Sequence, residues 1–317
     1  MTTIANGKNR KCAEAISKRE LAVCILFYER LEQTVKCIRS ILPSGVKIYI
    51  LNNGSSQLSR QELGRICSGY KQVKIFDSSI NLGVGIGRNH LLGHTTEEWM
   101  VFLDNDIIVK TRSWVDRITC HIESFKDNEV FIPRLFNAHE HRYVPYQPIQ
   151  VTCSGRIRGM QVVDDMINWF PGGASFVSRR LFERLGAYDE RMFVGLEDLE
   201  LGVRAIRSEN PVRGRLIDDI ELVHKHIGSK TDIDRQAVLT RYNLALIEAS
   251  TKRLNEKHNV TYDDGWRSWA MEQLAYSMGR RRIVFELRWI FRSLSTKLRN
   301  RYWIRKLLER ARAEVRI

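Results

Sequence analysis

The sequence predicts an α/β domain, with a mostly parallel sheet flanked by helices, followed by a helical C-terminal extension. Short apolar runs of strand length alternate with helix-like stretches through residues 21–107, as they do in βαβ units. Shorter strands and turns come next, and from residue 233 onward the apolar spacing is helical to the end. The 317 residues suffice for one large domain with an appendage.

Four apolar runs predict the first strands, at residues 21–27, 46–51, 73–76 and 99–103. A helix-like stretch at 31–42 follows the first run, and a polar helix at 61–70 precedes the third. The second run ends at Asn-Asn-Gly-Ser (52–55), and the fourth ends at Asp-Asn-Asp (104–106). Because parallel strands present their carboxyl ends at one edge of the sheet, we expect these two polar segments to converge on one cleft.

The pattern changes after about residue 131. Residues 130–178 indicate shorter strands with turns, and helices are predicted at 179–186 and 197–208. A late strand is predicted at 213–226. The chain contains no internal repeat and no low-complexity linker, which indicates one integrated domain before the extension.

The net charge of +14 is concentrated in the C-terminal tail. Residues 279–317 contain 13 Lys/Arg and 3 Asp/Glu, whereas the other 278 residues contain 38 and 34. Large apolar residues recur in the tail at three- and four-residue spacing, as at Ile283, Leu287, Ile290 and Leu294. A basic amphipathic helix of this kind is typical of binding to an anionic membrane surface. Packing on the domain or on a second copy of the chain remains the alternative.

The chain contains no run of about 18 uncharged apolar residues, as a membrane-spanning helix requires, and its N-terminus has no apolar signal-peptide core. We therefore expect a cytoplasmic protein that associates peripherally with the inner face of the membrane. The six cysteines form no metal-binding spacing and are interpreted as reduced.

Asp104-Asn105-Asp106 is the first candidate site, because two carboxylates at a strand end can bind Mg²⁺ or Mn²⁺ together with substrate phosphates. The alternative is a solvated turn. The second candidate is the glycine-spaced segment 81–89, which can bring backbone close to phosphate oxygens, with Arg88 adding a charged contact. Close packing at a tight loop is the alternative there.

Two further segments have both a structural and a functional interpretation. Glu197 and Asp198 open a predicted helix, where acids suit the helix dipole, or they supply a general base. They follow the small-residue segment 171–175. His224 and His226 flank a lysine at a strand end, where an imidazole is either solvated or a metal ligand.

Taken together, these segments resemble family 2 glycosyltransferases of the GT-A fold, the inverting enzymes that build bacterial surface polysaccharides. The matching segments occur in the order of the family and cover roughly residues 21–229: LAVCILFYER, YILNNGS, NLGVGIGRN, WMVFLDNDI, GGASFVSRRLFERLGAYDERMF, GLEDLELGVRA and VHKHIGS. The resemblance implies a catalytic domain (21–232) with a nucleotide-sugar half (21–107) and an acceptor half (108–232). We expect an N-terminal arm (1–20) before it and, from the helical spacing and the charge, a basic amphipathic helical extension (233–317) after it.

The resemblance also implies roles for single residues. Asp198 would be the general base, with Glu197 beside it, and Mn²⁺ or Mg²⁺ would be held by Asp104, Asp106 and His224, with His226 as second choice. The residues expected to contact the donor are Phe27, Tyr28, Glu29, Asn52, Asn53, Asn81, Gly83, Gly87, Arg88, Asp104 and Asn105. Those expected to line the acceptor side are Gly172, Gly173 and Ala174. The donor is expected to be a nucleotide sugar, with a UDP-sugar first, and the acceptor a glycan or a lipid-linked glycan.

Two residues depart from the family's pattern. Asn52 replaces the Asp that commonly contacts the nucleotide base, so it keeps an acceptor oxygen but loses the charge. Glu29 replaces an Asn, and the sequence gives it no role.

Other classes of function fit the sequence less well. A nucleotidyltransferase would need a Gly/Lys-rich loop after the first strand, where this chain has FYERLEQ. A nucleic-acid-binding protein would use the basic tail, but no recognised nucleic-acid module is present. An inactive scaffold is disfavoured by the retained DND and ED segments. The sequence leaves self-association open.

Overall fold

The computed structural model describes residues 20–138, 140–225, 231–262, 270–271 and 273–274. Its main feature is a ten-stranded sheet with the central order β10-β12-β6-β11-β4-β1-β2-β3, in which β5 pairs with β12 and β7 with β6. A separate two-stranded sheet is formed by β8 and β9.

The strands of the first half are β1 (Leu21–Phe27), β2 (Lys47–Asn53), β3 (Val73–Ser78), β4 (Trp99–Asp104) and β5 (Ile107–Val109). Those of the second half are β6 (Val130–Asn137), β7 (Arg142–Tyr143), β8 (Ile149–Val151), β9 (Ile157–Gly159), β10 (Met166–Ile167), β11 (Ala174–Ser178) and β12 (Gly214–His224). Strands β1 to β4 pair in parallel, as do β6 and β12, while β11 runs antiparallel between β4 and β6. The predicted mostly parallel sheet flanked by helices is confirmed.

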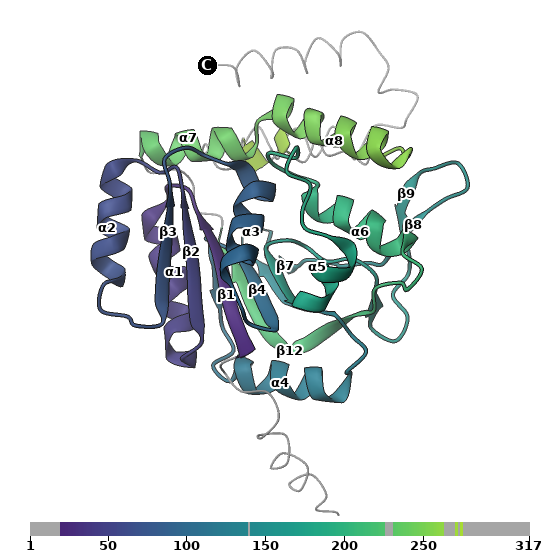
Figure 1. Ribbon diagram of the computed structural model, residues 1–317, viewed down its shortest axis with the longest axis horizontal. Coiled ribbons are helices and arrows are strands. Elements are labelled where there is room, and N and C mark those ends of the chain that lie inside the picture. The colour runs from purple at the N-terminus through teal and green to yellow at the C-terminus, as the bar shows by residue number, and fades with distance from the viewer. Residues whose placement is uncertain (1–19, 139, 226–230, 263–269, 272, 275–317) are drawn as a thin grey trace, which may run out of the picture. The chain divides into compact units, whose positions relative to one another are not determined.

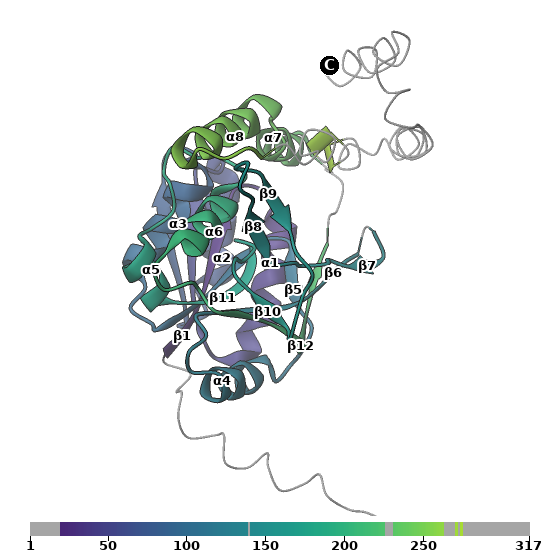
Figure 2. The same cartoon turned by 90° about the vertical axis from the view of Figure 1, so that its right-hand side faces the viewer.

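The helices are α1 (Leu31–Ile41), the 3₁₀ turn η2 (Leu42–Ser44), α2 (Gln57–Cys67), α3 (Gly83–His94), α4 (Trp114–Ser124), α5 (Arg179–Leu185), α6 (Glu197–Arg207), α7 (Asp232–Arg241) and α8 (Leu244–His258). Helices α1 to α6 flank the sheet on both faces (Figures 1 and 2). Alternate residues of β1 explain this arrangement. Val23 and Ile25 lie in the core cluster that α1, α2 and α4 share, whereas Ala22 and Cys24 lie in the cluster that α3, α5 and α6 share.

The described residues divide into two compact units. The first contains the sheet, with residues up to 225, together with residues 245–262. The second contains 231–244 and the described residues beyond 269. Most of α8 therefore belongs with the sheet, although the sequence analysis assigned everything after residue 232 to the extension.

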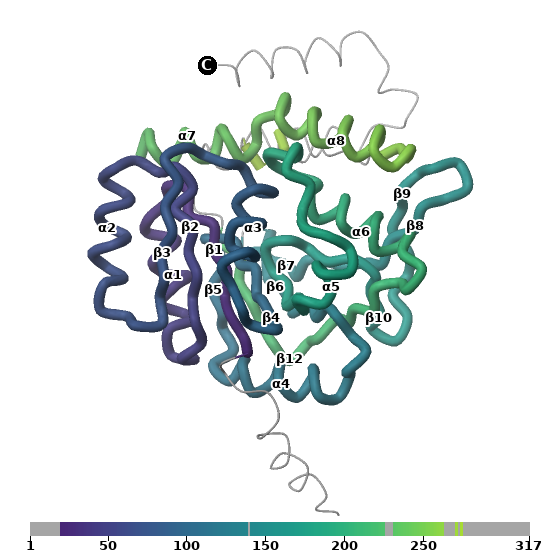
Figure 3. Tube along the Cα trace, viewed as in Figure 1, coloured from purple at the N-terminus to yellow at the C-terminus, as the bar shows by residue number. Residues whose placement is uncertain are grey.

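The chain stays in the first unit after α8. Thr261 N donates to Gly155 O in the turn between β8 and β9 (2.9 Å), and the trace in Figure 3 follows this hairpin. No helix among the described residues is both long and apolar enough to cross a membrane. The predicted N-terminal arm, apart from Glu20, and the amphipathic tail lie outside the described residues.

Candidate active site

The Asp-Asn-Asp segment is the turn between β4 and β5. Asp104 is the last residue of β4, and its backbone N–H donates to Gly173 O at 2.9 Å, which joins the turn to the segment before β11. The side chain of Asp106 is fully buried, whereas that of Asp104 is 27% exposed. The turn therefore presents one carboxylate to the surface and keeps the other inside the protein.

His224 lies next to these two carboxylates, although it is more than a hundred residues later in the sequence. It is the last residue of β12, and the antiparallel pairing of β12 with β5 sets it opposite Ile107. One ligand atom from each of Asp104, Asp106 and His224 lies within 4.8 Å of the others. His226, the second choice for a ligand, lies outside the described residues.

The distance between the ligand atoms of Asp106 and His224 fits a divalent cation. Asp106 Oδ1 and His224 Nε2 are 3.0 Å apart. Neighbouring ligands around an octahedral ion with bonds of about 2.1 Å are separated by about 3 Å, so one cation fits both atoms. Two carboxylates and one imidazole would leave several positions for water or phosphate oxygens.

Arg88 connects the first half of the site with the second. It projects from α3, and its Nη1 contacts Glu197 Oε1 at 2.6 Å, while Nη2 lies 3.8 Å from Asp104 Oδ1. Glu197 opens α6 and is buried, and burial raises its pKa to about 7, against the lowering effect of Arg88. The negative charge of Asp198 raises the pKa further. Glu197 therefore forms a buried ion pair with Arg88.

Asp198 is held differently from its neighbour. It is half-buried, and its Oδ2 accepts a hydrogen bond from Gly172 N at 3.0 Å, while Oδ1 accepts from Leu199 N at 2.8 Å. These contacts orient the carboxylate beside the glycine pair without an ion pair from the described residues. Of the two acids, Asp198 is the one that incoming solute can approach.

The glycine pair is explained by the side chains that lie against it. A Cβ on Gly172 would overlap the guanidinium of Arg88, and a Cβ on Gly173 would overlap the carboxylate of Asp104. Glycine at these two positions therefore lets Arg88 and Asp104 pack closely. The side chain of Ala174 is buried in the core, 2% exposed. Because β11 turns this side chain inward, a contact between Ala174 and the acceptor, which stays a prediction, would involve its main chain.

The glycine-spaced segment 81–89 packs against the protein itself. The N–H groups of Leu82, Gly83 and Val84 donate to Asn53 Oδ1, Asn81 Oδ1 and Phe193 O. A Cβ on Gly83 would lie 2.5 Å from Phe193 O. Close packing, the alternative interpretation, therefore accounts for these glycines.

The other two glycines of the segment have the same explanation. A Cβ on Gly85 would lie 2.7 Å from Asp189 O, and one on Gly87 would lie 2.9 Å from Leu26 Cδ2. The predicted donor contacts of Gly83 and Gly87 find no open backbone of the kind that a phosphate cradle requires. Arg88 is the residue of this segment that reaches the site.

Several residues expected to contact the donor are engaged with the protein. Asn52 Nδ2 donates to Asp77 Oδ1 at 2.9 Å, and Asn53 Nδ2 donates to Asn81 Oδ1 at 3.2 Å. Asn105 Nδ2 donates to Thr34 Oγ1 at 3.0 Å and is buried. These amides fix the ends of β2 and β4.

The segment after β1 gives a clear role to Glu29. Its carboxylate accepts hydrogen bonds from Ser56 N, from Ser56 Oγ at 3.2 Å and from Ser59 Oγ at 2.5 Å, so it caps the start of α2. Phe27 is fully buried in the core, which leaves only its main chain for a donor contact. Tyr28 is half-buried between them.

Sequence reasoning missed three residues of this region. Asp77, the residue before the last one of β3, pairs in register with Asn52, so a carboxylate does lie next to the asparagine that replaces the family's Asp. Tyr146 lies near the acids of the site, and burial together with the charges of Asp104 and Asp198 raises the pKa of its phenol. Arg30 Nη1 contacts Asp106 Oδ2 at 2.9 Å. A polar residue directly after the third strand was the available signal for Asp77.

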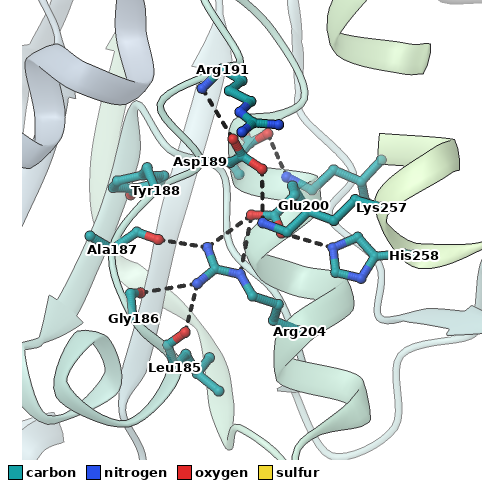
Figure 4. A network of polar contacts seen from close by, with 12 residues as sticks. Leu185, Gly186, Ala187, Tyr188, Asp189, Arg191, Glu200, Arg204, Lys257 and His258 are labelled. Carbon is teal, nitrogen blue, oxygen red and sulfur yellow. Dashed lines mark hydrogen bonds and ion pairs between the residues drawn. The ribbon is translucent and has the colours of Figure 1, made fainter. Parts of the chain in front are cut away.

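A second polar network joins α6 to α8. Glu200, on α6, is fully buried and lies 2.8 Å from both Lys257 Nζ and His258 Nε2 of α8 (Figure 4). Lys257 Nζ also lies 2.8 Å from Asp189 Oδ2. Arg204 contacts Glu200 at 2.8 Å and donates to the carbonyls of residues 185–187. The network therefore connects the helix that opens with Glu197 to the loop that packs on the glycines of α3.

We expect this network to stabilise the fold above about pH 4. Hydrogen bonds from their cationic partners lower the pKa of Asp189 and of Glu200 to about 2, although burial alone would raise both. A lowered pKa gives stability that is complete above the unfolded value of about 4 and is lost as the pH falls toward about 2. Urea unfolding of Glu200→Gln at pH 7 should show a loss of about 3 kcal/mol. The difference from wild type should shrink between about pH 4 and pH 2.

Glu62→Gln is the matched control for this prediction. Glu62 forms an exposed pair with Arg65 on α2, so its replacement should change the free energy of unfolding little at any pH. An equal effect of the two substitutions, or a Glu200→Gln deficit that does not depend on pH, would contradict the assignment.

Comparison with known proteins agrees with this geometry. Residues 22–186 match the family described as Glycosyl transferase family 2. A structure of GalNAc-T7 with UDP, GalNAc and Mn²⁺ is similar with a TM-score of 0.53 and 16% identity, over 82% of this chain and 57% of that chain. Residues 1–349 of S. aureus TarS, in complex with UDP-GlcNAc, give a TM-score of 0.52 and 13% identity, over 82% and 80%.

These similarities concern the fold, because the identities are low. The chain spans only part of the longer relatives, 57% of the GalNAc-T7 chain and 43% of a longer TarS chain. No curated protein matches the sequence significantly.

Proposed function

Because this chain belongs to glycosyl transferase family 2, we propose that it transfers a sugar from a nucleoside diphosphate donor to a hydroxyl group of a glycan or lipid-linked glycan. The observation that carries this proposal is the edge of the sheet at which Asp104, Asp106 and His224 lie within 4.8 Å of one another. Arg88 lies next to Asp104, and Glu197 and Asp198 follow at the start of α6.

The donor side is proposed at the ends of β1 to β4. Tyr28, Asn52 and Asp77 would form the nucleotide-base end, where Asp77 supplies the charge that Asn52 lacks. A UDP-sugar is the donor we propose, supported by the UDP in the GalNAc-T7 structure and the UDP-GlcNAc in the TarS structure. Arg88, with a guanidinium already near Asp104, would attract the diphosphate.

A divalent cation, Mn²⁺ or Mg²⁺, would neutralise charge that develops on the diphosphate leaving group when bound at Asp104, Asp106 and His224. Asp104 is the more exposed carboxylate and would face the donor. Asp106 and His224 are more buried and would fix the site from within. Mn²⁺ in the GalNAc-T7 structure supports a cation of this class.

Asp198 is proposed as the general base. Gly172 N–H holds one of its oxygens, which orients the carboxylate toward an acceptor hydroxyl. As that hydroxyl oxygen attacks the anomeric carbon, Asp198 takes its proton, and the bond to the diphosphate breaks on the opposite face of the sugar. A single displacement of this kind inverts the anomeric configuration. Glu197, bound to Arg88, would keep the arginine in place rather than accept the proton.

The proposal that the acceptor is presented at a membrane is based on the sequence. A role for residues 279–317 in binding an anionic membrane surface stays a prediction, because these residues lie outside the described part of the chain. It suits an acceptor that is linked to a lipid, and it would keep the protein at the inner face of the membrane.

Thermal melting with a panel of nucleotide sugars, each with Mn²⁺ and with EDTA, tests the proposal. A donor that binds the folded protein raises the melting temperature by mass action, so one nucleotide class should give a shift of several degrees that depends on the cation. Transfer is then measured with that donor and candidate acceptors. Absence of any nucleotide-dependent shift would contradict the proposed function.

A further inference from the structure

Arg30 is a charged residue held beneath the Asp-Asn-Asp turn. It precedes α1 with a positive φ of 55°, and its carbonyl accepts hydrogen bonds from both the backbone N–H and the hydroxyl of Thr34, each at 3.1 Å. Its side chain is only 8% exposed. The backbone thus turns the guanidinium away from solvent and toward the site.

Two consecutive residues of the turn, Asn105 and Asp106, contact the start of α1. Arg30 Nη1 contacts Asp106 Oδ2 at 2.9 Å, and Thr34 Oγ1, one helical turn later, accepts from Asn105 Nδ2 at 3.0 Å. Because two side chains four residues apart meet two neighbours of the turn, the Arg30–Asp106 pair is fixed on both sides. It differs in this respect from an exposed ion pair, which solvent screens.

The two oxygens of Asp106 face different partners. Oδ2 is directed to Arg30, while Oδ1 is 3.0 Å from His224 Nε2. A cation that binds Oδ1 and His224 would leave the Arg30 contact intact. It would also stand within a few ångströms of a second positive charge, in a part of the protein where water screens poorly.

We propose that Arg30 is the internal counter-charge of the metal site, and this inference rests on the proposed function. Arg30 stabilises the buried carboxylate of Asp106 while no divalent cation is bound, because a positive charge 2.9 Å away offsets part of the cost of burying a negative one. The same positive charge weakens binding of the cation alone. Firm binding of the cation then requires the additional oxygen ligands and negative charge of the donor's diphosphate.

The test is the affinity for Mn²⁺ alone, measured by isothermal titration calorimetry at one fixed pH. Arg30→Gln removes the charge and should tighten Mn²⁺ binding by about tenfold or more, because a unit charge a few ångströms away is worth over 1.4 kcal/mol at an effective dielectric constant of about 20. Arg30→Lys keeps the charge and should stay close to wild type. Arg117→Gln, which removes an exposed arginine paired with Asp219, should have no effect.

The melting temperature with and without Mn²⁺ shows whether an altered affinity of Arg30→Gln results from poor folding. Addition of Mn²⁺ should raise the melting temperature of Arg30→Gln more than that of wild type, because the empty site is what the substitution destabilises. A variant that is unfolded in EDTA and is not folded by Mn²⁺ would contradict the proposal. So would Mn²⁺ binding that is unchanged or weaker in Arg30→Gln, or tightened equally in Arg30→Lys.

The result for the wild type separates this inference from the proposed function. A wild-type protein that binds no Mn²⁺, with or without UDP, would overturn the metal assignment and the role of Arg30 with it. A wild type that binds Mn²⁺ and UDP together, with an Arg30→Gln variant that binds Mn²⁺ no more tightly, would overturn the role of Arg30 alone.

Discussion

Replacement of Asp198 by Asn should reduce kcat for sugar transfer by about 10³-fold, within the range typical for loss of a general base. The amide keeps the shape of the carboxylate, and its oxygen can still accept the hydrogen bond from Gly172 N, so the loop before β11 should stay in place, although the amide NH2 group cannot accept the second hydrogen bond, from Leu199 N. What disappears is the group that accepts the acceptor's proton. Donor affinity, measured by the melting shift with the nucleotide sugar, should therefore change little, and the defect should appear in kcat.

Glu197→Gln is the control for this assignment. Glu197 is bonded to Arg88 at 2.6 Å and is buried, so its replacement should lower the melting temperature and weaken donor binding through Arg88. Its effect on kcat should be smaller than that of Asp198→Asn. A well-folded Glu197→Gln variant with the larger loss of kcat, or a nearly normal kcat in Asp198→Asn, would reverse the roles of the two acids.

The fold could be predicted because the strands of the first half are continuous apolar runs. Residues such as Val23 and Ile25 lie on one face of β1, and Ala22 and Cys24 on the other, and both faces are covered by helices. Such strands are recognisable without knowledge of their neighbours. The membership of residues 245–262 in the same unit was missed, because helical spacing does not show that Leu254 and Val260 pack with apolar residues of α6, or that Lys257 pairs with Glu200.

The candidate site was predictable to the extent that its residues follow strands. Asp104 and Asp106 follow β4, and His224 ends β12, so strand ends alone bring all three to one edge. The sequence did not predict the roles of residues that pack against, or hydrogen-bond to, distant parts of the chain. Gly83 and Gly85 of α3 face the loop at residues 189–193, and Glu29 caps α2, contacts that no local pattern reveals.

The charge pairing at Asp106 decides how the metal assignment is best tested. Asp106→Ala should abolish metal-dependent donor binding and transfer, but it also removes the buried ion pair between Asp106 and Arg30. The alanine variant should therefore lose stability as well, by about 3 kcal/mol or more, the typical cost of breaking a buried ion pair. Loss of activity in Asp106→Ala alone would not distinguish metal binding from folding.

Asp106→Asn separates the two effects. The amide oxygen can accept the hydrogen bond from Arg30, so the variant should melt closer to wild type than the alanine variant does, while the loss of the negative charge removes the ligand that binds the cation. Transfer should fall by more than about 100-fold, since loss of an outer partner of a metal ligand alone costs roughly 10- to 100-fold. Wild type in excess EDTA should behave in the same way as Asp106→Asn and recover when Mn²⁺ is restored, whereas the variant should not. Full transfer by the wild type in EDTA would contradict the assignment of a catalytic cation to Asp104, Asp106 and His224.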